Sequence, residues 1–191
     1  NMSATKSKSK KASAPAKQSA GFSLESKVEQ AFHHHSGRKV MDAPTEKSPI
    51  IEVANFPALG RLTALRFIEW VLQNPEGVVS LPTGKTPEYF IKWTQHYLTN
   101  WNTKEIQKEL GDLGIPTEKK PDFRGLRFVQ IDEFYPIDPN QHNSFYYYVN
   151  THYIRGFNMD RERALLINSA HIGVPRGMSI DDIFPGGKVD L

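Results

Sequence analysis

The segment VVSLPTGKTPE, residues 78–88, holds residue types whose spacing indicates a chemical role. It runs from an apolar strand into a turn, and Pro87 suits the first turn of a helix because its φ angle is fixed. The turn carries the hydroxyls of Thr83 and Thr86 and the ammonium of Lys85. Together with the free N–H groups at a helix start, these groups form a site for an anion of monophosphate size. The alternative is a capped turn that binds no ligand.

The same turn partly matches the P-loop of nucleotide hydrolases, G-x-x-x-x-G-K-[ST], through Gly84, Lys85 and Thr86. The first glycine of that motif falls on Val79, inside the expected strand, so the backbone has no glycine with which to wrap a β-phosphate. The segment FVQIDE, residues 128–133, resembles a Walker B strand, but any buried strand with acidic residues at its end has this pattern. A nucleotide hydrolase is therefore a minor alternative.

Two carboxylates, Asp132 and Glu133, directly follow the apolar segment 126–131. In open parallel α/β sheets, ligands bind outside the carboxyl ends of the strands. The turn after residue 81 also lies at such an end, so we expect the turn and the carboxylates to face one crevice. A phosphate anchor beside a carboxylate predicts a sugar phosphate whose far end is acted on by a base.

The elements that position these residues are predicted from apolar periodicity. Alternating strands and helices predict an α/β fold, a Rossmann-like three-layer sandwich with a mainly parallel sheet. We expect the sheet to be incomplete, because the chain stops where KVDL begins to resemble another strand. The expected strands are 50–56, 77–81, 126–131 and 163–168, and the expected helices are 57–74, 87–100, a short one around Ile106 and Leu110, and 144–154, which Ser144 caps.

Composition divides the chain of 191 residues into three parts. Residues 1–20 hold five lysines and no acidic residue, which predicts a disordered tail. Residues 21–49 form an N-terminal extension with a short helical pattern, and 50–191 the N-terminal part of the α/β domain. Without the five tail lysines, the 24 basic residues become 19 against 21 acidic residues. The basic balance thus belongs to the tail, and we expect no nucleic-acid partner.

Several classes of site are disfavoured by composition. The chain has no cysteine, so disulfides, thiolate catalysis and cysteine-based zinc sites are excluded. His33, His34 and His35 are adjacent, and on a helix they point in different directions, so we expect no metal site there. No apolar run approaches 18 residues and no signal-peptide core is present, which predicts a cytoplasmic protein without a membrane partner.

Two segments in order resemble a known family. SLPTGKTPEYFIKW, followed by FVQIDEFYPIDPNQHNSFYYYVNTHYI, is similar to the glucosamine-6-phosphate deaminase (isomerase) family. The family has a strand followed by L-P-T-G-[GS]-T-P, then a strand followed by M-D-E-Y, a proline-bearing loop and an aromatic helix that contains Ser-Phe. The resemblance covers residues 50–170.

The resemblance implies a role for each matching residue. The turn would bind the phosphate of a small-molecule sugar phosphate through Thr83, Gly84, Lys85 and Thr86. Asp132 would be the base that moves a proton between C2 and C1 of the opened sugar, with release of ammonia and formation of fructose 6-phosphate. Glu133 would either support the loop or act directly. The family needs no redox or metal cofactor.

The chain departs from the family in two places. Lys85 stands where the family has Gly or Ser, and an added cation is compatible with phosphate binding. The segment similar to D-G-H-I-A-F-N-E, with the ring-opening histidine, is absent from these 191 residues, as is the later phosphate-binding lysine region. We therefore interpret the chain as the N-terminal part of a longer deaminase-like enzyme and expect the chain alone to be inactive.

Two further alternatives stay open. The related 6-phosphogluconolactonases read S-G-G-S-T-P and then D-E-R, whereas this chain has Leu81, Pro82 and Thr83 before Gly84 and has Phe134 after its Asp-Glu pair. A non-catalytic sugar-phosphate-binding or structural protein is the other alternative, because the ring-opening segment is missing. Homo-oligomerisation is compatible with the sequence, which does not decide it.

Overall fold

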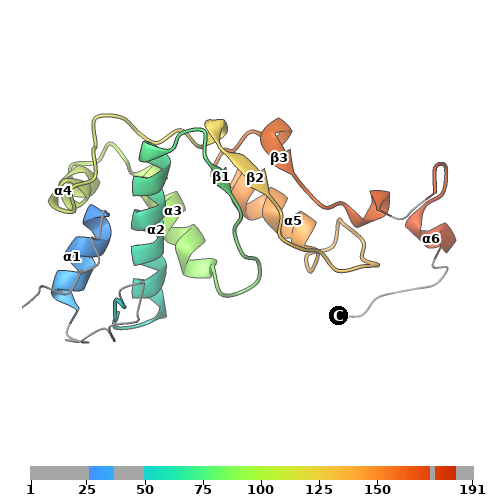
Figure 1. The fold of residues 1–191 in the computed structure, drawn as a ribbon, viewed down its shortest axis with the longest axis horizontal. Helices are drawn as coiled ribbons and strands as arrows, with labels where there is room; N and C mark the ends of the chain where they lie inside the picture. Colours follow the sequence, from blue (N-terminus) through green and yellow to red (C-terminus); the bar gives the residue numbers. More distant parts are fainter. Residues whose placement is uncertain (1–25, 37–49, 173–174, 184–191) are drawn as a thin grey trace, which may run out of the picture.

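The computed structural model describes residues 26–36, 50–172 and 175–183. The tail predicted at 1–20 lies outside these residues. Helices and strands alternate along most of the described chain (Figure 1). The helices are α1 (Lys27–His35), α2 (Phe56–Gln73), α3 (Glu88–Thr99), α4 (Lys104–Asp112), α5 (Phe145–Val149) and α6 (Ile180–Ile183), and the strands are β1 (Val78–Val79), β2 (Arg127–Val129) and β3 (Ala164–Leu165).

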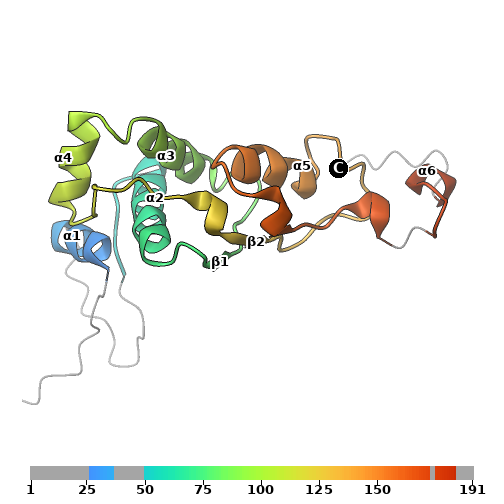
Figure 2. The ribbon, with the colours of Figure 1, turned by 90° about the horizontal axis from the view of Figure 1, so that it is seen from above.

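The three strands form one parallel sheet in the order β1-β2-β3, with Val78 opposite Arg127 and Phe128 opposite Ala164. Helices α2, α3 and α5 lie on one face of this sheet (Figure 2). That face carries the buried Val79 and Phe128, whereas Val78 and Leu165 on the opposite face are 61% and 70% exposed. The α/β fold with a parallel sheet is confirmed, and the described residues build two of the three expected layers.

The prediction of a strand at 50–56 is wrong. Residues 50–55 have no regular structure, and Asn55 caps α2 by accepting a hydrogen bond from the N–H of Ala58 at 2.9 Å. The segment lies by the end of α2 and away from the three strands (Figure 1). A β-strand needs a neighbouring strand to pair its N–H and C=O groups, and no strand of the described residues pairs with this segment. The apolar Ile50 and Phe56 are accordingly half exposed.

The other predicted helices and strands within the described residues are present, whereas the strand expected to begin at KVDL lies outside these residues. The predicted helices at 57–74, 87–100 and 144–154 are found, the last continuing from α5 as a π-helix at Asn150–Arg155. The predicted strands at 77–81, 126–131 and 163–168 are found as shorter strands, and the helix around Ile106 and Leu110 is α4.

The core is built around the contact between α2 and α3. Apolar side chains recur at a spacing of three to four residues along α2. Of these, Leu65, Ile68 and Val71 are buried, while Leu59 is 43% exposed. Gly60 allows the two helices to approach closely, because a Cβ atom at this position would lie 2.4 Å from the Cβ atom of Tyr89. Aromatic rings fill the space between these helices and the sheet, and they come from Phe67, Phe90, Phe123, Tyr153 and Phe157.

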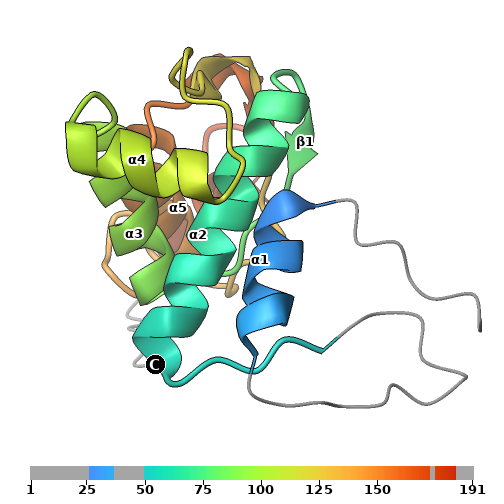
Figure 3. The same cartoon turned by 90° about the vertical axis from the view of Figure 1, so that its left-hand side faces the viewer.

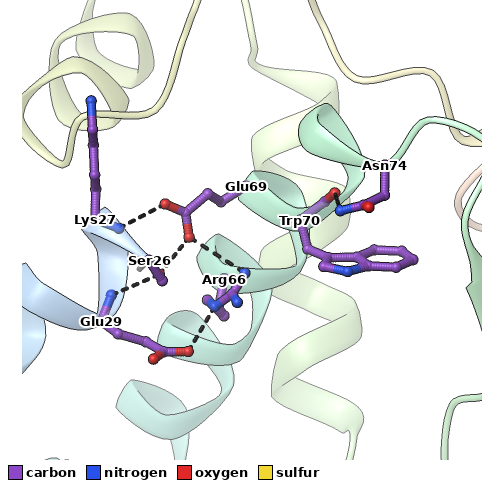
Figure 4. A network of polar contacts seen from close by, with 7 residues as sticks. All are labelled: Ser26, Lys27, Glu29, Arg66, Glu69, Trp70 and Asn74. Atoms are coloured by element: carbon purple, nitrogen blue, oxygen red, sulfur yellow. Dashed lines mark hydrogen bonds and ion pairs between the residues drawn. The ribbon is translucent and has the colours of Figure 1, made fainter. Parts of the chain in front are cut away.

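A buried carboxylate fixes α1 against α2. Helix α1 runs alongside α2 (Figure 3). Glu69 of α2 is 3% exposed and accepts hydrogen bonds from the Ser26 hydroxyl and from the Lys27 N–H at 2.9 Å (Figure 4). Arg66 lies 3.5 Å from the same carboxylate and 2.7 Å from that of Glu29. The burial of Glu69 is thus compensated by one cation and two hydrogen bonds.

The close approach of α2 and α3 gives the first prediction. We expect Gly60→Ala to lower the free energy of unfolding by about 1–3 kcal/mol, because the added methyl group overpacks the interface with Tyr89. Gly111→Ala in α4 is the matched control, since its Cβ atom would meet nothing within 4 Å. The same change there is neutral or stabilises the helix by up to about 1 kcal/mol. Chemical denaturation of both variants measures this, and equal effects would contradict the role of Gly60.

Candidate functional site

The turn between β1 and α3 presents the predicted anion-binding residues to solvent. Gly84, Lys85 and Thr86 are exposed and Thr83 is half-buried. Gly84 has a φ angle of 86°, in the left-handed region that favours glycine, and open space surrounds the position of its missing Cβ atom. The backbone geometry of the turn, and not a shortage of space, therefore requires glycine here.

Helix α3 begins beside this turn without a side-chain cap. Its N-cap residue is Pro87, which makes no side-chain capping hydrogen bond. The first N–H groups of a helix have no partner within the helix, and the helix dipole places partial positive charge there. The N–H of Glu88 already donates to the carbonyl of Lys85 at 3.2 Å, and the Glu88 carboxylate pairs with Lys92. The exposed ammonium of Lys85 and the partial positive charge of the helix start still favour an anion here.

Asp132 and Glu133 have different surroundings, although they are adjacent. Asp132 is exposed, and its backbone carbonyl accepts a hydrogen bond from the Gln130 side chain at 2.8 Å. The carboxylate of Glu133 accepts hydrogen bonds from the Ser144 hydroxyl at 2.7 Å and from three backbone N–H groups. These belong to Phe134, Phe145 and Tyr146, at 2.9, 3.0 and 2.7 Å. Glu133 therefore fastens the strand end to the start of α5.

Helix α5 brings the two halves of the site together. Its N-terminal end is bound to Glu133, and the hydroxyl of Tyr148 donates a hydrogen bond to the carbonyl of Gly84 at 2.8 Å. The hydroxyl of Tyr153, in the π-helix that follows, donates to the carbonyl of Pro82. The anion-binding turn and the Asp132–Glu133 segment thus contact one short helix, as expected for residues at the carboxyl ends of neighbouring strands.

Buried polar groups hold the strand ends in place. Gln130 is 5% exposed and connects β2 to the segment after β3, because its side-chain oxygen accepts a hydrogen bond from the Ile167 N–H at 3.0 Å. The same side chain binds the backbone of Asp132, as described above. Ser80, at the end of β1, donates to the carbonyl of Val129 at 2.5 Å. The backbone that presents Asp132 is therefore fixed from both sides.

An apolar cavity of about 210 Å³ lies behind the turn. Pro82, Thr86 and Pro87 form one wall, and Leu59 and Phe90 belong to the others. Its lining carries no ionisable group, so an anion would bind at the exposed side of the turn and not in this cavity. Among the described residues, no group of three or more His, Cys, Asp or Glu is arranged to hold a metal ion. No helix in the described part is long and apolar enough to cross a membrane.

Comparisons with known proteins point to one group of enzymes. A glucosamine-6-phosphate deaminase of Bacillus velezensis is 26% identical over 117 residues, which are 61% of this chain and 41% of that protein. The enzyme of the same name from Alkaliphilus oremlandii is 28% identical over 127 residues, covering 66% of this chain and 42% of that protein. The chain is similar in sequence to the glucosamine-6-phosphate deaminases. No family model matches it.

The fold agrees with this similarity. A solved monomeric glucosamine-6-phosphate deaminase of the NagB superfamily superimposes with a TM-score of 0.51 and 18% identity, over 64% of this chain and 43% of that one. This likeness shows the α/β fold that the chain shares with the deaminase. In both comparisons the chain spans less than half the length of the relatives that it matches.

Sequence reasoning missed the residues that hold the site together. Ser144 was predicted only as a helix cap, yet its hydroxyl also donates to Glu133. Gln130 was assigned to a strand and given no role. Tyr148 and Tyr153 were read as parts of an aromatic helix. One sequence feature could have revealed the tyrosines. A turn leaves backbone carbonyls without partners, and tyrosine hydroxyls in a neighbouring helix are donors that can bind them.

The different surroundings of the two carboxylates give the second prediction. We expect Glu133→Gln to lower the free energy of unfolding by about 2 kcal/mol, because an amide loses the charge-assisted bonds and turns an NH₂ group toward the N–H donors. Asp132→Asn, the neighbouring control, should change it by less than about 0.5 kcal/mol, since Asp132 is exposed. Denaturation of both variants measures the difference. A larger loss for Asp132→Asn would contradict the anchoring role of Glu133.

Proposed function

We propose that this chain is the sugar-phosphate-binding part of a glucosamine-6-phosphate deaminase-like enzyme, which converts an amino-sugar phosphate to fructose 6-phosphate with release of ammonia. One observation carries the proposal: α5 joins the exposed turn to Glu133, the neighbour of the exposed Asp132 at the next strand end. The sequence and fold similarity to deaminases supports the choice of reaction.

In this proposal the turn holds the substrate's phosphate. Thr83, Gly84, Lys85 and Thr86 supply backbone N–H groups, hydroxyls and one ammonium, and the uncapped start of α3 adds its partial positive charge. The phosphate keeps its charge throughout isomerisation, so these groups bind substrate and transition state equally and position the sugar chain.

Asp132 is proposed as the base. An aldose–ketose isomerisation removes a proton from C2 of the opened sugar and returns it to C1, and one carboxylate can do both when it is held over the two carbons. Asp132 is suited to this task because its backbone is fixed by Gln130 while its side chain is exposed. Glu133 already accepts four hydrogen bonds, so we propose that it positions Asp132 and does not itself transfer a proton.

Phosphate binding is tested directly on the chain by the third prediction. We expect Lys85→Ala to weaken binding of glucosamine 6-phosphate about five- to tenfold, because one charge-assisted contact to the phosphate is lost. Lys92→Ala is the control, since Lys92 is also an exposed lysine but pairs with Glu88 at 2.5 Å in α3. Isothermal titration of wild type and both variants measures the affinities.

Two outcomes would count against the binding proposal. Equal losses for Lys85→Ala and Lys92→Ala would show that the turn is not the phosphate site. Thermal stabilisation of the chain by Mg·ATP but not by glucosamine 6-phosphate would favour the nucleotide-hydrolase alternative.

The role of Asp132 gives the fourth prediction, tested on the protein encoded by the complete reading frame. Asp132→Asn should lower kcat for ammonia release by at least about a hundredfold, because general acid–base catalysis contributes a factor of that order. The affinity of the variant for the sugar phosphate should stay within about threefold of the wild-type value, because the turn is unchanged. Loss of one strong contact would instead change the affinity by about tenfold. Turnover of the variant at the wild-type rate would show that the base lies elsewhere.

A further inference from the structure

We propose that Tyr148 and Tyr153 are positioning residues for the anion-binding turn, and that the π-helix after α5 is the feature that lets both reach it. The inference deepens the proposed function and rests on it where ligand binding is concerned. It concerns how the turn is shaped, and neither tyrosine is proposed to touch the substrate.

The two hydroxyls bind alternate carbonyls of the turn. Tyr148 donates to the carbonyl of Gly84 at 2.8 Å, and Tyr153 donates to the carbonyl of Pro82. A trans peptide is planar, so each N–H points opposite to the carbonyl before it. Holding these two carbonyls toward the helix therefore turns the N–H groups of Thr83 and Lys85 away from it, toward the exposed side of the turn. Two of the donors available to a phosphate are oriented in this way.

The π-helix makes this double contact possible. Tyr148 and Tyr153 are five residues apart, and in an α-helix, with about 100° per residue, they would be separated by about 140° around the axis. Tyr148 lies in α5, and the chain between it and Tyr153 enters the π-helix at Asn150–Arg155. The wider i→i+5 turns of the π-helix reduce this angular separation. The two rings accordingly lie against each other, with centroids 5.9 Å apart and edge to face.

The surroundings of the two phenols favour a fixed, protonated donor. Tyr153 is fully buried, and its ring contacts Phe128 of the central strand and Phe157. Burial raises the pKa of Tyr153, and burial followed by the charge of Glu88 raises the pKa of Tyr148. Both hydroxyls therefore keep their protons at neutral pH. A buried phenol also needs a hydrogen-bond partner, which the turn provides.

The position of α5 connects this arrangement to the catalytic segment. Glu133 accepts a hydrogen bond from the N–H of Tyr146, near the start of α5. Tyr148, which donates to the turn, lies only two residues further along the same helix. The helix therefore sets the position of the turn relative to the strand end that carries Asp132. A substrate bound at the turn would be placed with respect to the base by this helix.

The test compares Tyr148→Phe and Tyr153→Phe with Tyr147→Phe in the 191-residue chain. Tyr147 is the matched control, because it lies on the same helix with its side chain 38% exposed. The first readout is the backbone dynamics of residues 83–86 by amide NMR without ligand. We expect increased mobility of these amides in the first two variants, and unchanged amides in the α2 core around Ala64 and Leu65.

The second readout is the affinity for inorganic phosphate and for glucosamine 6-phosphate. Each of the two variants should bind about fivefold more weakly, because loss of one hydrogen bond lowers the fraction of molecules whose turn has the binding geometry. Tyr147→Phe should bind like wild type. A merely structural role would instead lower the melting temperature without changing the turn amides relative to the rest of the core.

The two readouts separate this inference from the proposed function. If wild type binds neither ligand, the proposed function fails, while the NMR comparison still decides whether the tyrosines shape the turn. Turn amides that move equally in all three variants would overturn the positioning role. Unchanged affinity in Tyr148→Phe and Tyr153→Phe, with a wild type that binds, would overturn it as well.

Discussion

The carboxylate of Glu133 is the group on which the arrangement of the site depends. It lies at the end of the central strand and accepts four hydrogen bonds, three of them from backbone N–H groups. Two of those N–H groups, from Phe145 and Tyr146, belong to the start of α5, where the helix dipole also favours a negative charge. The strand end and the helix therefore behave as one unit, and the tyrosines of that helix extend the unit to the anion-binding turn.

The two helix starts near the site differ in how their donors are used. At α5, Ser144 and Glu133 satisfy the first N–H groups, which makes this helix a fixed part of the structure. At α3, the N-cap is Pro87 and no side chain caps the helix. N–H donors at an exposed helix start cost little stability, because water binds them. An anion can take the place of that water. The same physical feature is an anchor in one helix and, in the proposed function, a binding surface in the other.

The sequence was sufficient to predict helices and strands with a strong periodicity of apolar residues. It was insufficient to predict the contacts between these elements. The buried stripe of α2 and the strands that precede the site were predictable because apolar spacing reports burial. Residues 50–56 have the composition of a strand but pair with no strand in the part of the chain that the structure describes. Such pairing is a property of the whole fold and not of a local segment. The turn and the carboxylates were found as candidates from local chemistry. The bonds from Tyr148 and Tyr153 depend on a π-helix, whose wider turns leave no periodic signal in the sequence.

The buried Glu69 sets a condition on how the chain can be shortened. Composition places the start of the α/β domain at residue 50, but the carboxylate of Glu69 is covered by Ser26 and Lys27 of the preceding segment. A polypeptide that began at residue 50 would lose both donors to Glu69 and would uncover the face of α2 against which α1 packs. A shortened chain that keeps this packing must therefore include Ser26 and Lys27. In this sense the N-terminal helix is a structural part of the domain that it precedes.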